Sequence, residues 1–325
     1  MIIVSYLSLF VDANAETRPD MALLFPGQSS QTVGMGLELY QHSDSARDIF
    51  RLAEDSLGEA LNQTMFYGPP EDLTAPSVAQ PAVLTASVAC LCAMREYLQP
   101  GKLPRPLFVA GHSLGQLTSA VAVGAITVED AIWLARQRGL LMESALEEFP
   151  GTTASIVGLD QIVIKEIARQ SGVDVVHEES FDRFVMAGAK LPMARAIDLA
   201  MARGAIRSIL MESVGAAHTQ LMNEAAKELR RLIDEIEIRD PLIPIISLRS
   251  LEQLGESAVV RNELANELCS PLRWKDGLEY MSSQGVQRFL EIGPGQVLSS
   301  LVRTWLPSAD AVALSGPTSI QRMSR

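Results

Sequence analysis

Short apolar runs alternate along this chain with longer segments in which apolar residues recur every three or four positions. The apolar runs at 22–26, 107–111, 154–159, 184–188, 243–248 and 288–293 predict buried strands. Helical periodicity is clearest at 46–57, 83–98, 128–146, 194–202 and 219–236. Thr127, followed by two acidic residues, predicts the N-cap of the third of these helices. This alternation predicts an α/β fold with a mainly parallel sheet.

The segment 149–212 has an element order of its own. Its pattern predicts a strand at 153–160, a helix at 161–170, two strands within 174–188, a helix at 194–204 and a strand at 206–210. That order is typical of a ferredoxin-like α+β unit. We therefore expect a small subdomain at 149–212, inserted into a large subdomain made of 21–148 and 213–310.

Residues 1–20 do not fit this pattern. A short apolar stretch precedes Ala13-Asn14-Ala15, which is similar to a signal-peptide cleavage site, but the positively charged start of such peptides is missing. We interpret residues 1–20 as a disordered or misassigned extension ahead of Met21.

Composition narrows the class of protein. The chain has 325 residues, 47% of them hydrophobic, and a net charge of −12, which argues against nonspecific nucleic-acid binding. Cys90, Cys92 and Cys269 have neither metal-ligand spacing nor a disulfide pattern. This use of cysteine is typical of proteins in a reducing compartment. We expect that no apolar run is long enough to span a membrane. We expect a cytoplasmic protein with no nucleic-acid or membrane partner and no metal.

The motif Gly111-His112-Ser113-Leu114-Gly115 lies between a predicted strand and a helical segment. Glycines on both sides of a serine allow a sharp strand-to-helix turn that exposes the hydroxyl. In this context Ser113 is a candidate nucleophile.

A serine hydroxyl needs a base, usually a histidine, and the chain has four histidines. His112 adjoins the serine and is expected to point away from it, His42 lies in a polar stretch, and His177 lies in the small unit. His218 follows small residues and precedes a helix. By elimination, His218 is the candidate base.

Arg138 falls on the apolar stripe of the predicted helix 128–146. A buried guanidinium needs an anionic partner. Two interpretations remain open: an internal ion pair with an acidic side chain, or a fork that binds a substrate carboxylate.

The turn after the first strand, Pro26-Gly27-Gln28, could present a backbone N–H to the same site. Together with the N–H of Leu114, the N–H of Gln28 would form an oxyanion hole.

These motifs together resemble one enzyme family. Gly27-Gln28-Ser29-Ser30-Gln31, the serine motif, Arg138-Gly139, Ala217-His218 and the run FLEIGPGQVL resemble malonyl-CoA:acyl carrier protein transacylases, including the acyltransferase domains of polyketide synthases. The resemblance runs from about Met21 to about Leu306.

The resemblance implies an α/β-hydrolase-like large subdomain with an inserted ferredoxin-like small subdomain. It also implies that Ser113 is the nucleophile, His218 the base, Gln28 and Leu114 the oxyanion donors, and Arg138 the ligand of the malonyl carboxylate. The mechanism that the resemblance implies is ping-pong: an acyl group moves from CoA to the serine and then to the phosphopantetheine thiol of an acyl carrier protein. The partners implied are acyl-CoA and that carrier protein, with no bound cofactor.

Three residues at the expected site depart from the family pattern. Gln116 stands where glutamate is usual, Glu267 replaces a glutamine in the segment that orients the histidine, and Ala217 replaces the phenylalanine of many malonyl-specific relatives. A carboxylate at Glu267 could raise the pKa of the histidine. Ala217 leaves room for a larger acyl group. With Arg138, Ala217 and Gln116 are the candidate substrate-binding residues.

Several functions stay open at this point. The main alternatives are transfer of a bulkier or non-malonyl acyl group between carrier proteins, and hydrolysis of acyl groups from carrier proteins. A plain esterase would want an acid between serine and histidine and would not need Arg138. A noncatalytic binding module would be expected to have lost Ser113 or His218.

Overall fold

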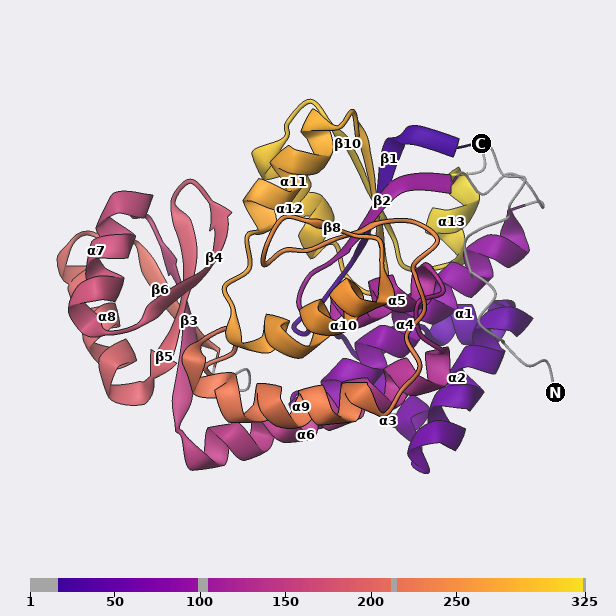
Figure 1. Cartoon of the computed structure of the whole chain (residues 1–325), viewed down its shortest axis with the longest axis horizontal. Coiled ribbons are helices and arrows are strands. Elements are labelled where there is room, and N and C mark those ends of the chain that lie inside the picture. Colours follow the sequence, from indigo (N-terminus) through magenta and orange to yellow (C-terminus); the bar gives the residue numbers. More distant parts are fainter. Residues whose placement is uncertain (1–16, 99–104, 212–214, 324–325) are drawn as a thin grey trace.

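The computed structural model describes residues 17–98, 105–211 and 215–323. The predicted α/β class with an inserted small subdomain is confirmed, and the two parts are built on separate sheets (Figure 1). The interpretation of residues 1–16 lies outside the described residues. The first strand, however, begins at Thr17 rather than at Met21, because residues Thr17 and Arg18 already pair with Arg105 and Pro106.

The large sheet has six strands in the order β10-β9-β1-β2-β7-β8. Its pairs are parallel except for β7 with β8. The strands are β1 (Thr17–Phe25), β2 (Arg105–Gly111), β7 (Ile245–Ile246), β8 (Gln253–Leu254), β9 (Arg288–Ile292) and β10 (Asp310–Leu314).

Alternating side chains of the central strands pack on opposite faces of this sheet. Leu23 and Phe25 join one core with the helices α2 (Asp44–Leu57), α4 (Pro76–Tyr97), α5 (Gly115–Ala122), α6 (Val128–Glu148) and α9 (Asn223–Asp234). Ala22 and Leu24 join a second core with α11 (Trp274–Ser283) and α12 (Val297–Trp305). The other helices of the large subdomain are α1 (Leu37–His42), α3 (Leu61–Tyr67), η1 (Pro70–Leu73), η3 (Gln220–Met222), α10 (Ser257–Asn266), η4 (Glu267–Cys269) and α13 (Pro317–Met323).

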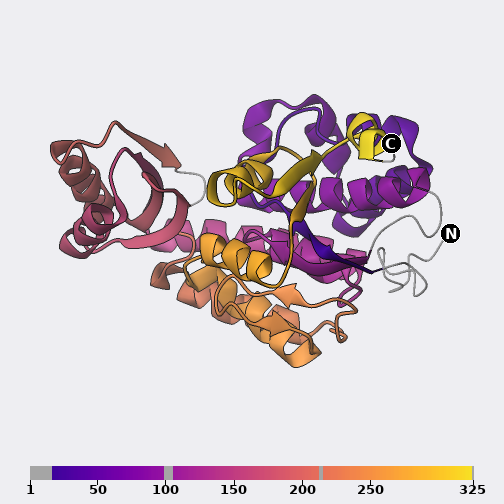
Figure 2. The same cartoon turned by 90° about the horizontal axis from the view of Figure 1, so that it is seen from above.

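The small sheet is antiparallel, in the order β4-β5-β3-β6. Its elements follow the predicted order: β3 (Gly151–Val157), α7 (Gln161–Ser171), β4 (Asp174–Ser180), β5 (Arg183–Ala189), α8 (Lys190–Ala202) and β6 (Arg207–Met211). Helices α7 and α8 pack on one face of this sheet. The other face is turned toward the large subdomain (Figure 2).

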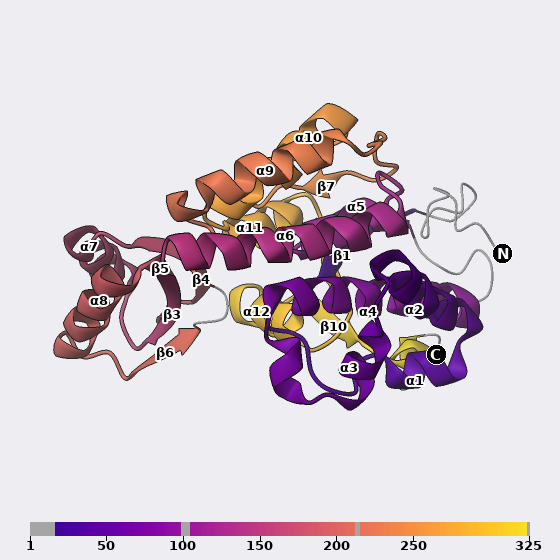
Figure 3. The same ribbon diagram turned by 90° about the horizontal axis from the view of Figure 1, so that it is seen from below.

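Helix α6 connects the two subdomains, running along the large one and ending at the first strand of the small one (Figure 3). It begins as predicted, because the Thr127 hydroxyl accepts a hydrogen bond from the N–H of Asp130 at 2.9 Å.

Helix α4 corrects one sequence-based expectation. By length and composition it could cross a membrane, contrary to the prediction that no apolar run could. Nearly all of its most apolar stretch, however, is buried inside the protein. It is a core helix that packs against α2 and α6.

Candidate active site

Ser113 lies in the tight turn between β2 and α5, with a φ of 53° that is unusual for a residue with a side chain. The turn requires its glycines. A Cβ on Gly111 would lie 1.9 Å from the carbonyl carbon of Gly115, and a Cβ on Gly115 would lie 2.1 Å from the carbonyl oxygen of Phe25. The backbone geometry therefore holds the hydroxyl away from the sheet, at the carboxyl end of β2.

His218 is brought to Ser113 from a segment 105 residues later in the chain. Its Nε2 lies 3.0 Å from the Oγ of Ser113. Its Nδ1 lies 3.1 Å from the backbone carbonyl oxygens of both Glu267 and Ser270. Because carbonyl oxygens only accept hydrogen bonds, Nδ1 carries the proton and Nε2 is left to accept one from the serine. The two carbonyl oxygens take the place of the acid in a serine triad, because they hold the Nδ1 proton and orient the imidazole.

The protonation state of His218 suits a base. Burial is the largest influence and lowers the pKa of His218 below its ordinary value, and the positive charge of Arg138 lowers it further. The carboxylate of Glu267 and the two carbonyl oxygens act in the opposite direction. The net direction is downward, so the imidazole is neutral near pH 7.

Arg138 is buried in α6 and also reaches the serine. Its Nη2 donates to the Oγ of Ser113 at 2.9 Å and to Oε2 of Glu267 at 3.1 Å. Its Nη1 donates to Oε1 of Gln80 on α4 at 2.9 Å. The internal ion pair considered from the sequence is therefore present, and the guanidinium nevertheless lies beside the nucleophile.

A cavity of about 150 Å³ opens over Ser113, between the two subdomains. The large subdomain contributes, among others, Gln28, His112, Ser113, Arg138, Met142, Ala217, His218 and Leu298, and the small sheet contributes Thr153, Val176, His177, Glu179, Val185 and Met211. The predicted candidates Gln28 and Ala217 thus line the same cavity as the serine and the histidine.

Of the two predicted oxyanion donors, only Gln28 is among the residues that line the cavity, and Leu114 directly follows the serine in the chain. Leu114 precedes the first turn of α5, where backbone N–H groups have no partner within the helix. Gln28 follows β1 and lines the cavity, and its side-chain oxygen accepts a hydrogen bond from Gln80 at 3.2 Å. The assignment of both N–H groups to an oxyanion stays a prediction.

Gln116 is placed differently from the expectation that it binds substrate. Its side chain is buried and donates to the carbonyl oxygen of Ile246 at 3.0 Å. It is not among the residues that line the cavity. Because the amide points toward β7, its role in this structure is to join α5 to the sheet.

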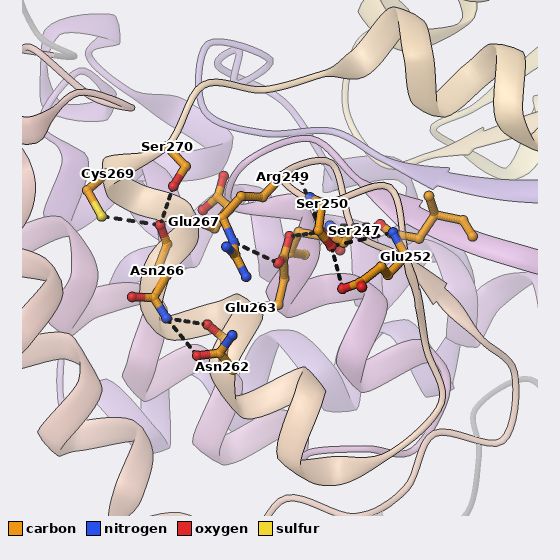
Figure 4. Close-up of polar contacts among 12 residues, drawn as sticks. Ser247, Arg249, Ser250, Glu252, Asn262, Glu263, Asn266, Glu267, Cys269 and Ser270 are labelled. Carbon is orange, nitrogen blue, oxygen red and sulfur yellow. Dashed lines mark hydrogen bonds and ion pairs between the residues drawn. The ribbon is translucent and has the colours of Figure 1, made fainter.

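Glu267 stands at the turn after α10 (Figure 4). Its backbone and its side chain make different contacts in the site. Its carbonyl oxygen orients His218, as the resemblance implied, while its carboxylate pairs with Arg138. Behind it, Glu263 accepts hydrogen bonds from Ser247 and Arg249 (Figure 4).

Some residues of the site were missed from the sequence. His112 and His177 pack edge to face with ring centroids 4.8 Å apart, and His112 also contacts Trp274. Gln80 holds both Arg138 and Gln28. A signal for Gln80 did exist, since a polar residue in the long apolar segment 76–94 needs a buried partner.

The chain is similar to known proteins over nearly its whole length. Residues 22–320 match the model of the acyl transferase domain family. The malonyl CoA-acyl carrier protein transacylase of Bacillus subtilis is 36% identical over 306 residues, covering 93% of this chain and 95% of that protein. The crystal structure of an acyl carrier protein S-malonyltransferase from Vibrio cholerae is 34% identical, with a TM-score of 0.87 over 94% of this chain and 99% of that one. A malonyl-transacylase solved in complex with a type II PKS acyl-carrier protein is also 34% identical, with a TM-score of 0.86 over 93% and 98% of the two chains.

Proposed function

We propose a function for this chain from the premise that it belongs to the acyl transferase domain family, among the malonyl CoA-acyl carrier protein transacylases. The chain is an acyltransferase that moves a malonyl group from CoA to an acyl carrier protein. The observation that supports a mechanism for this transfer is the contact of Ser113 with both His218 and Arg138.

In the first half-reaction the Oγ of Ser113 attacks the thioester carbonyl carbon while Nε2 of His218 takes the hydroxyl proton. The carbonyl oxygen becomes an oxyanion beside the N–H groups of Gln28 and Leu114. When the C–S bond breaks, the proton on His218 passes to the departing CoA sulfur. The product is malonyl-Ser113.

In the second half-reaction the phosphopantetheine thiol of the carrier protein gives its proton to His218 and attacks the ester carbon. Ser113 is the leaving group and recovers the proton from His218. Because the thioester itself supplies the activated acyl group, the chemistry needs no resident cofactor. This agrees with the proposal that CoA serves as a substrate only.

Arg138 is the proposed ligand of the malonyl carboxylate. Its Nη2 is 2.9 Å from the Oγ of Ser113, so the far end of a short acyl group held on the serine lies within reach of the guanidinium. A fixed cation in a mostly apolar cavity lined by both subdomains orients the acyl group and limits the access of water. We further propose that the reaction takes place in the cytoplasm, where the thiols of Cys90 and Cys92 stay free, as they are here.

The test is the intact mass of the protein after mixing with malonyl-CoA. We expect one malonyl group per chain in the wild type and none in Ser113→Ala. The matched control is Ser119→Ala, which removes another hydroxyl, buried on α5 outside the cavity and should keep the adduct. Addition of acyl carrier protein should then discharge the adduct to the carrier. Release of free malonate in place of malonyl carrier protein would assign the site to hydrolysis.

A further inference from the structure

The ion pair between Arg138 and Glu267 is not required by the transfer chemistry. The hydrogen bonds of His218 Nδ1 go to the backbone carbonyls of Glu267 and Ser270. Oε1 of the Glu267 carboxylate lies 3.7 Å from Nδ1, beyond hydrogen-bond distance. Yet both charged side chains are only 4% exposed, and they lie 3.1 Å apart. Burial of a carboxylate is costly, and the remaining oxygen, Oε1, has no hydrogen-bond partner within the described part of the chain. A carboxylate kept there under these conditions needs an explanation.

The N–H groups on the two terminal nitrogens of Arg138 are already in use. Each terminal nitrogen of a guanidinium carries two N–H groups. Nη2 contacts Ser113 and Glu267, and Nη1 contacts Gln80 and, at 3.5 Å, the sulfur of Met142. A carboxylate of the substrate can therefore bind the fork in bidentate fashion only if it displaces one of these contacts.

The charges around the fork are also compensated. Glu267 neutralises Arg138, and Arg249 is paired with Glu263 next to it. Among the described residues that line the cavity, Arg138 is the only lysine or arginine, and Glu179, the only carboxylate, is paired with Arg183. An entering carboxylate thus meets a neutral pair rather than a free cation, and it adds a negative charge close to Glu267.

We propose that Glu267 is a specificity-determining positioning residue that competes with the substrate carboxylate for Arg138. Its charge lowers the preference of this enzyme for carboxylate-bearing acyl groups over neutral acyl groups of the same size. This inference rests on the proposed function, because it assigns Arg138 to the acyl group on Ser113.

The experiment compares malonyl-CoA with acetoacetyl-CoA, in which a neutral methyl ketone replaces the carboxylate. Rates of Ser113 acylation give kcat/KM for each thioester, and their ratio is the readout. In Glu267→Gln the amide keeps the shape and an acceptor for Arg138 but loses the charge, so the malonyl-to-acetoacetyl ratio should rise about tenfold or more. Glu263→Gln is the matched control. It removes a buried carboxylate four residues earlier that is paired with Arg249, and it should leave the ratio within about twofold of wild type.

A merely structural role of Glu267 would lower both rates together, so an unchanged or smaller ratio in folded Glu267→Gln overturns the proposal. If that variant does not fold, the wild type still decides. A wild-type preference for malonyl-CoA above about a thousandfold would mean that Glu267 does not weaken carboxylate binding.

Failure of the proposed function has a different signature, because the wild type would then form no acyl-serine with either thioester. Equilibrium binding of the two thioesters to Ser113→Ala, with and without Glu267→Gln, tests the competition independently of transfer. If Glu267→Gln raises the ratio of malonyl-CoA affinity to acetoacetyl-CoA affinity about tenfold, the proposal is supported in that case too. If the ratio is the same with and without Glu267→Gln, the proposal is refuted.

Discussion

The packing of His112 against His177 predicts that the fold loses stability when the pH is lowered from 7 to 5. Burial lowers the pKa of His112 to about 4, and burial also places the pKa of His177 well below its usual range. Both rings are therefore neutral in the folded protein at pH 5. In the unfolded chain both have ordinary pKa values of about 6.5 and bind protons over this interval.

The sign and the size follow from proton linkage. A group whose pKa is lowered by folding stabilises the protein fully above its unfolded pKa, and that stability is lost as the pH falls toward the folded pKa. Between pH 7 and pH 5 each of these histidines removes about 2 kcal/mol, so the pair removes about 4 kcal/mol.

The assay is urea unfolding of the wild type and of His177→Gln at pH 7, 6 and 5. The variant keeps a polar side chain of similar reach but cannot bind a proton. Its loss of unfolding free energy from pH 7 to pH 5 should be about 2 kcal/mol smaller than that of the wild type. Equal pH dependence in the two proteins would show that His177 is not held neutral and would refute this reasoning.

Three further predictions concern the site and its supports. Gly139→Ala places a Cβ 2.5 Å from the carbonyl of Pro76, where α6 crosses α4; we expect a loss of about 2 kcal/mol or more in urea unfolding, and an unchanged midpoint would contradict this contact. Glu291→Ala removes the buried carboxylate that accepts hydrogen bonds from two backbone N–H groups of α12. We expect the unfolding free energy to fall by about 2 kcal/mol or more and to fall less in Glu291→Gln; equal losses in the two variants would argue against capping. The rate of serine acylation should stay constant above pH 6.5 and fall only at lower pH, because burial lowers the pKa of His218; a rate still rising through pH 7.5 would refute the assignment.

The main elements were predictable because their physical signals are local. The apolar runs and the helical stripes place the central strands and the long helices, and the glycines around Ser113 mark its turn. Strand β10 was missed because its apolar run, residues 311–314, has only four residues, two of which are alanine. Strand β7 pairs only over Ile245 and Ile246, much less than its apolar run suggested. The length of a strand depends on its partners, and β7 pairs with β2 at Ile245 alone and with the two-residue strand β8.

The site was predictable where a single residue was anomalous in its own surroundings. Arg138 on an apolar stripe required an anionic partner whatever the fold. The identity of this partner could not be read from the sequence, because Glu267 lies 129 residues away. The whole small subdomain lies between the two residues in the chain. The pairing of His112 with His177 is equally nonlocal, since His112 follows β2 of the large sheet and His177 lies in β4 of the small sheet.

The division of the cavity between two sheets has a consequence for how such an enzyme can change. Ser113, Arg138 and His218 all belong to the large subdomain, whereas Thr153, Val185 and Met211, which line the opposite wall, belong to the small sheet. The two sheets are separate hydrogen-bonded networks, so a substitution in the wall does not disturb the register of the strands that hold the nucleophile. The contribution of this wall to acyl-group selection can therefore vary while the nucleophile, Arg138 and Glu267 stay in place, and exchange of residues 151–211 between relatives is a direct way to alter it.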